Sequence, residues 1–178
     1  FRVLSAGTGE NAGLLKAAQL WSKKLEHTRA LPYYEAAVLL TPQDPEALDG
    51  LGACLLELGR HAEARTHLNA ALALAPGHVG TREHLGICYA AQGEFAGAEA
   101  VFAALVAEQP QRAHGHRLLA MAQRERQQFT AAANSMARAG RLAKQPAWLV
   151  QAGEFHASGG AIAAARKLAQ EALLMSPG

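Results

Sequence analysis

The chain has 178 residues and a formal net charge of +2; half of its residues are hydrophobic, but only 6% are aromatic. So small a charge argues against a general nucleic-acid binder, and no run of about 18 uncharged apolar residues is present to span a bilayer. Abundant alanine with few β-branched and aromatic residues favours packed helices over a sheet.

The first ten residues begin with Phe1 rather than methionine and show no secretory signal. We interpret segment 1–10 as an N-terminal extension or linker with a cut or processed start, from which an address could have been removed. The sequence therefore leaves the compartment open.

The prolines mark an internal repeat. Pro42, Pro76 and Pro110 are 34 residues apart, and Gly59 and Gly93 repeat at the same interval. Self-similarity at such a period is typical of stacked repeat architectures. The phase divides the chain into five units, residues 11–44, 45–78, 79–112, 113–145 and 146–178.

The pattern of apolar residues in each unit predicts two helices. In the second unit, Leu48, Leu51 and Leu55 recur at helical spacing, and Leu68 belongs to a second such stripe. Three units have a glycine between the stripes, where a left-handed residue would end the first helix: Gly59, Gly93 and Gly160. Small residues should let the paired helices pack closely: Gly52, Ala64 and Ala71.

Two positions depart from the pattern. Pro32 lies in the second helix of the first unit, and we expect it in the first turn if that helix begins near Thr28, because the missing amide is tolerated there. Unit 113–145 has lost its terminal proline and slips by one residue, so its second helix is expected to run longer or to end loosely.

These motifs resemble the tetratricopeptide repeat, which has the pattern W-x2-L-G-x2-Y, then A-x3-F, an alanine and a late proline. Units 45–78 and 79–112 fit well, whereas Gln123 and Gln127 replace the large apolar residue and the glycine in the fourth unit. The resemblance implies an all-α, right-handed solenoid of about five helix hairpins. It also implies a concave groove, lined by the first helices, that holds an extended peptide or a helix.

By this resemblance the partner-binding groove would include Lys16, Gln19, Lys23, Asp49, Leu56, Glu83, His84, Ile87, Arg117, Met121, Arg124, Gln151 and Glu154. Apolar and charged residues mixed in this way suit an amphipathic segment. Some family members bind chaperone C-termini through a clamp of lysines, asparagines and an arginine. The clamp positions here hold Leu15, Gln19, Gly50, Gly80 and His84, so chaperone-tail recognition is not expected.

No phosphate loop, zinc-binding histidine pair or nucleophile elbow occurs, so we expect no enzyme activity and no cofactor. His84, His114 and His116 are candidate metal ligands without a third ligand at a known spacing, and we expect no metal site. Cys54 and Cys88 occupy equivalent positions of adjacent units. We expect them to be half-buried thiols, too far apart for a disulfide.

Charge is unevenly distributed. Residues 112–144 contain seven basic residues and one acid, Glu125, whereas segments 45–78 and 79–111 are mainly acidic. The plain interpretation is a solvated helix surface. The sharper hypothesis is that the basic fourth unit meets an acidic segment of a partner, since arginine pairs well with carboxylates.

The sequence thus predicts a protein-interaction scaffold, whose composition rich in Ala, Gly and Arg suggests a bacterial source. Its setting could be secretion, pilus or envelope-polysaccharide assembly, in the cytoplasm or the periplasm. One alternative is the recruiting module of a larger enzyme such as a glycosyltransferase, and another is a self-assembling scaffold. Segment 161–175 stays apolar without a capping helix after it, so we expect a longer protein or packing on another subunit.

Overall fold

The computed structural model describes the backbone of residues 2–175 and the side chains of residues 9–175. Within this range the chain forms ten α-helices and no strand, which confirms the all-α prediction. The helices are α1 (Arg2–Lys23), α2 (His27–Leu40), α3 (Pro45–Glu57), α4 (His61–Leu74), α5 (Val79–Ala91), α6 (Phe95–Glu108), α7 (Ala113–Glu125), α8 (Phe129–Ala143), α9 (Pro146–Ser158) and α10 (Ile162–Met175). Residues 2–10, expected to be an extension or linker, form the first part of α1.

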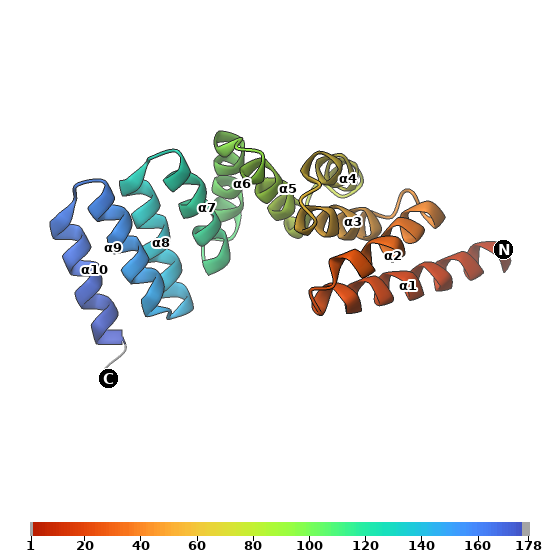
Figure 1. Cartoon of the computed structure of the whole chain (residues 1–178), viewed down its shortest axis with the longest axis horizontal. Coiled ribbons are helices and arrows are strands. Elements are labelled where there is room, and N and C mark those ends of the chain that lie inside the picture. Colours follow the sequence, from red (N-terminus) through yellow and green to blue (C-terminus); the bar gives the residue numbers. More distant parts are fainter. Residues whose placement is uncertain (1, 176–178) are drawn as a thin grey trace. The chain divides into compact units, whose positions relative to one another are not determined.

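The helices belong to two compact units. Unit 1 comprises residues 1–92 and contains α1 to α5, while unit 2 comprises residues 93–178 and contains α6 to α10. Figure 1 shows the successive helices of each unit, in red to green and in green to blue. None of the helices in the described range is long and apolar enough to cross a membrane.

Unit 1 is held together by close packing of α3 on α4. Ala64 and Ala71 are buried, and a Cβ atom added to Gly52 would lie 2.7 Å from the Leu68 side chain. The small residues therefore permit the close approach that the sequence predicted. Leu55 and Leu68 are fully buried in the same core, where close packing makes each methylene group count.

Unit 2 has a separate core between α7, α8, α9 and α10. Met136 and Leu149 are fully buried there, and Phe155 is buried in the same core. A Cβ atom on Gly140 would lie 3.1 Å from Leu149, so a small residue is again needed where α8 meets α9.

A left-handed residue follows the first helix of each pair. Gly59 (φ 75°), Gly93 (φ 79°) and Gly160 (φ 79°) confirm the predicted turn glycines. Leu25 and Gln127 occupy the equivalent positions and adopt φ 60°. The repeat thus imposes the same backbone turn on side chains that disfavour it.

Pro32 is not in the first turn of its helix, so that prediction was wrong. α2 begins at His27 and Pro32 lies inside it, where proline provides no N–H for the Thr28 carbonyl. Residues on both sides of the proline are buried, including Ala30 and Tyr34. Tertiary packing therefore overrides the helix-breaking tendency of proline.

The end of α8 explains the slip in the repeat. α8 has 15 residues whereas α4 and α6 have 14, which confirms a longer second helix. It does not end loosely, because Lys144 closes it in the left-handed conformation (φ 52°). Only residues 144–145 connect α8 to α9, whereas four residues, 109–112, connect α6 to α7. One residue is gained in α8 and two are lost from the connection, so this repeat has 33 residues instead of 34.

Candidate peptide-binding site

Three first helices of unit 1 surround a cavity of about 430 Å³. α1 contributes Gln19, α3 contributes Glu46 and Asp49, and α5 contributes His84. The amide of Gln19 donates a hydrogen bond to Glu46 Oε1 over 3.0 Å, which ties α1 to α3 at the rim. Three of the predicted groove residues, Gln19, Asp49 and His84, are thus brought together.

His84 and Asp49 form the polar centre of this cavity. Nδ1 of His84 lies 2.8 Å from Oδ1 of Asp49, and the two side chains are 33% and 16% exposed. Burial lowers the pKa of His84, but the hydrogen bond to Asp49 and the charges of Asp49, Glu83 and Glu57 outweigh it, so the pKa is raised. The cavity therefore combines two carboxylates, Glu46 and Asp49, with an imidazole whose pKa is raised.

A second depression of about 230 Å³ adjoins the first along α3. Both are lined by Tyr34, Gly50, Ala53 and His84. The second adds the half-buried side chains of Leu56 and Ile87, two more of the predicted groove residues. A polar section and an apolar section are therefore continuous, as an amphipathic peptide requires.

Tyr34 is a lining residue that the sequence analysis missed. A Cβ atom on Gly50 would lie 2.3 Å from Tyr34 Cε1, so the ring lies directly on the backbone of α3. Burial raises the pKa of the Tyr34 phenol. The available signal was Gly50 itself, because a glycine inside a helix often marks a close approach.

The remaining predicted residues of unit 1 are placed differently. Lys16 and Lys23 are exposed on α1. Glu83 on α5 is 7% exposed and therefore buried, although it occupies the same repeat position as Asp49.

In unit 2 the predicted residues lie on α7 and α9. Arg117 stacks over the Trp148 ring at 5.7 Å, and Arg124 over the Phe155 ring at 6.0 Å. Arg124 also forms an ion pair with Glu125. Both guanidinium groups therefore have partners within the unit, which reduces their availability to a ligand.

The other predicted residues of unit 2 do not form one polar cluster. Met121 packs against the core, Gln151 is half-buried and Glu154 is exposed.

The cysteines are more deeply buried than expected. Cys54 and Cys88 are thiols with 2% and 0% exposure, so the prediction of half-buried side chains was wrong. Each Sγ donates a hydrogen bond to the carbonyl of a residue 27 positions earlier, His27 at 3.3 Å and His61 at 3.1 Å. They connect the first helix of one pair to the start of the preceding second helix.

The candidate metal ligands are separate in the described part of the chain, where no three His, Cys, Asp or Glu residues cluster. His84 pairs with Asp49, and Nε2 of buried His116 donates to the Pro110 carbonyl over 2.9 Å. His114 is exposed.

Sequential helix hairpins with small residues at their contacts and a recurrent left-handed turn define a helical repeat scaffold. Two tetratricopeptide repeat models match the sequence, one over residues 15–79 and one over residues 59–122. The matches together cover more than half of the chain. The protein belongs to the tetratricopeptide repeat family, a class of protein-interaction scaffolds that are typically non-catalytic.

Solved structures of low sequence identity share the fold. MamA from Desulfovibrio magneticus RS-1 has a TM-score of 0.81 at 21% identity, with 93% of this chain and 94% of that chain covered. PilW, described as a type IV pilus biogenesis factor, has a TM-score of 0.81 at 23% identity, with 92% and 77% covered. YrrB, described as having an unusual peptide-binding site, has a TM-score of 0.72 at 18% identity, with 92% and 85% covered. No curated protein matches the sequence.

Proposed function

We propose that this protein is an interaction scaffold that holds a partner peptide along the first helices of unit 1. The observation that carries the proposal is the cavity of about 430 Å³ lined from α1, α3 and α5. Its continuation over Leu56 and Ile87 supplies an apolar surface beside the polar one. The bound segment would be amphipathic, with hydrogen-bonding groups toward Asp49 and His84 and an apolar side chain over Ile87.

The acidic side chains at this cavity favour a donor-rich segment. Glu46 and Asp49 line the cavity, and Glu57 lines the adjoining depression. A lysine or arginine of the partner would gain a charge-assisted hydrogen bond there.

A peptide library displayed on phage and selected against the full chain tests this proposal. Ala53 lines both parts of the site, so Ala53→Trp should fill it and reduce the affinity of selected peptides at least tenfold. Ala70→Trp, at an exposed position of α4, is the matched control and should leave the affinity unchanged. Selected peptides that bind the Ala53→Trp variant as tightly as the parent chain would refute this location.

The proposed setting is bacterial secretion, pilus or envelope-polysaccharide assembly, in the cytoplasm or periplasm. The shared fold of PilW, described as a type IV pilus biogenesis factor, supports the pilus system as the first to examine. A partner found there should contain a segment that competes with the selected peptides.

Self-association through α10 is a second candidate function. Leu173 and Leu174 are 72% and 83% exposed, and Ile162 is 57% exposed. Contiguous exposed apolar side chains favour protein contacts. Light scattering should show a mass that increases with concentration and returns to the monomer value in the variant Leu173→Glu, Leu174→Glu. A constant monomer mass would exclude this candidate.

A further inference from the structure

The second helices of unit 2 enclose a groove that is separate from the predicted peptide-binding face. The groove lies between α8 and α10 over α9, with a volume of about 500 Å³. Figure 1 shows these three helices side by side, with α9 between the other two. Its polar lining consists of Asn134, Arg138 and Arg141 from α8, His156 from α9, and Lys167 and Glu171 from α10.

One end of this groove already holds a carboxylate. Glu171 accepts two hydrogen bonds from Arg141, from Nε over 2.7 Å and from the terminal nitrogen over 2.8 Å. This contact raises the pKa of Arg141 and lowers the pKa of Glu171. The geometry is the bidentate one in which arginine binds carboxylates most strongly.

The other two cations of the groove have no such counter-ion. Arg138 donates a long hydrogen bond of 3.4 Å to the neutral amide oxygen of Gln111. Lys167 has no ion pair or hydrogen bond within the described residues. The groove therefore has an excess of two positive charges, because its lining contains three cations, Arg138, Arg141 and Lys167, and one carboxylate, Glu171.

The floor of the groove contains a buried polar group with an unmade hydrogen bond. His156 is 8% exposed, and its Nδ1 has no hydrogen-bond partner among the described residues. Such a group costs free energy until a partner is supplied. This second observation, independent of the surface charge, places a polar side chain with unused hydrogen-bonding capacity in the lining of the groove.

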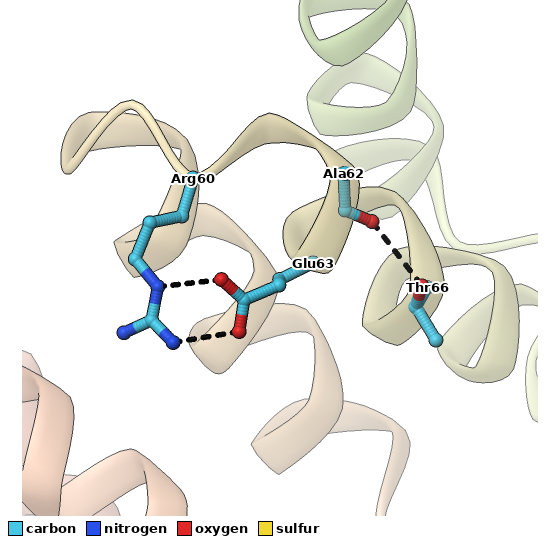
Figure 2. A network of polar contacts seen from close by, with 4 residues as sticks. All are labelled: Arg60, Ala62, Glu63 and Thr66. Atoms are coloured by element: carbon cyan, nitrogen blue, oxygen red, sulfur yellow. Dashed lines mark hydrogen bonds and ion pairs between the residues drawn. The ribbon is translucent and has the colours of Figure 1, made fainter.

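The corresponding groove of unit 1 shows that an excess of positive charge over a polar floor is not a general property of the repeat. It lies between α2 and α4, measures about 330 Å³ and has Leu51 and Leu55 at its floor. Its one arginine, Arg60, is bound by Glu63 through contacts of 2.7 and 2.6 Å, as Figure 2 shows. With Glu35 also present, one cation faces two carboxylates.

We propose that the α8–α10 groove binds an acidic peptide segment of a partner protein, with its carboxylates held between Arg138 and Lys167. The cationic stretch from Asn134 to Arg141 is about 10 Å long at 1.5 Å per helical residue, which matches about three extended peptide residues. The groove has no aromatic side chain other than the histidine on which a base could stack, so a peptide fits better than single-stranded nucleic acid.

Fluorescence anisotropy with the full chain tests this inference. The probe is a fluorescein-labelled peptide, Gly-Ser-Asp-Glu-Glu-Gly-Ser, compared with its Asn-Gln-Gln counterpart and with a single-stranded oligonucleotide. The acidic peptide should bind, the neutral one at least tenfold more weakly, and added salt should weaken the acidic complex. Absence of binding at millimolar peptide, or tighter binding of the oligonucleotide, would overturn the proposal.

Variants locate the site. Arg138→Glu, Lys167→Glu should weaken binding at least tenfold, whereas Glu171→Gln should strengthen it severalfold because the internal carboxylate is removed. The charge-matched control Lys24→Glu, Arg166→Glu lies at exposed positions outside the groove and should stay within twofold of the parent chain.

A third variant tests whether the acidic peptide binds instead at the predicted groove residues of α7. Arg117→Glu, Arg124→Glu reverses the charges that stack on Trp148 and Phe155. If this variant loses the acidic peptide while Arg138→Glu, Lys167→Glu retains it, the α8–α10 groove is not the binding site. If both charge-reversal variants unfold, Arg138→Gln, Lys167→Gln provides the same comparison with less perturbation.

Discussion

His84 on α5 and Asp49 on α3 are 35 residues apart in sequence, yet Nδ1 of the imidazole lies 2.8 Å from the carboxylate. The contact joins first helices of adjacent repeats at the proposed peptide site. Since one partner is a histidine, whose pKa is raised here by the carboxylate, the charge of the site depends on pH.

Replacing Asp49 with asparagine should lower the pKa of His84. The carboxylate is the main influence that raises this pKa, and burial would then dominate. An NMR titration of the imidazole in both proteins measures the effect. An unchanged pKa in Asp49→Asn would show that the pair does not control the protonation of His84.

The same pair should make stability depend on pH. Because the folded-state pKa of His84 is raised, its stabilising contribution is fully present below the unfolded value of about 6.5 and is lost as pH rises through the folded pKa. The difference in unfolding free energy between the parent chain and Asp49→Asn should therefore shrink from pH 6 to pH 9. Urea unfolding at each pH gives this difference, and a constant value would contradict the assignment.

Two of the five turn positions have a residue other than glycine, and replacing that residue with glycine should stabilise the protein. Leu25 and Gln127 both have φ 60°, and Leu25 is 79% exposed, so little packing is lost. Relief of left-handed strain should make Leu25→Gly and Gln127→Gly each more stable by about 1 kcal/mol. Urea unfolding measures both, with Gly59→Leu as the reverse control expected to lose a similar amount. Stabilisation by Gly59→Leu would contradict the explanation.

Removing the internal proline of α2 should also stabilise the fold. Pro32 is exposed, so Pro32→Ala restores a helical N–H without opening a cavity. The expected gain is about 2 kcal/mol, because the helix penalty of proline exceeds the unfolded-state entropy it removes. Thermal unfolding should give a higher midpoint. The control Pro146→Ala, in the first turn of α9, should change stability by less than about 0.5 kcal/mol.

The Cys54 thiol should be unreactive in the folded protein. Burial, followed by the nearby charge of Glu35, raises its pKa to about 11. Thiolate is therefore scarce at pH 8, and access is blocked as well. Iodoacetamide should modify Cys54 at least about a hundredfold more slowly in the native protein than in urea, as measured by mass spectrometry of its peptide. Comparable rates would show that α3 opens readily from the start of α2.

The repeat and its helices could be predicted from the sequence because the signals are local. The pair Leu51-Gly52 recurs as Leu85-Gly86 after 34 residues. The glycine after the first helix, Gly59 in the second repeat, forms the same left-handed turn in three repeats. The position of Pro32 inside α2 could not be predicted in this way, because buried neighbours such as Tyr34 hold the helix together against a local preference.

What the tertiary structure alone decided is which side chains meet. The sequence placed Asp49 and His84 on one predicted face, but only the folded chain brings them into hydrogen-bonding distance. It also buries Glu83, although the repeat equates that position with Asp49, and it places Arg138 and Lys167 in the lining of one groove. Periodicity fixes the direction in which a residue faces along its own helix, whereas contact and burial depend on the particular neighbours that other helices supply.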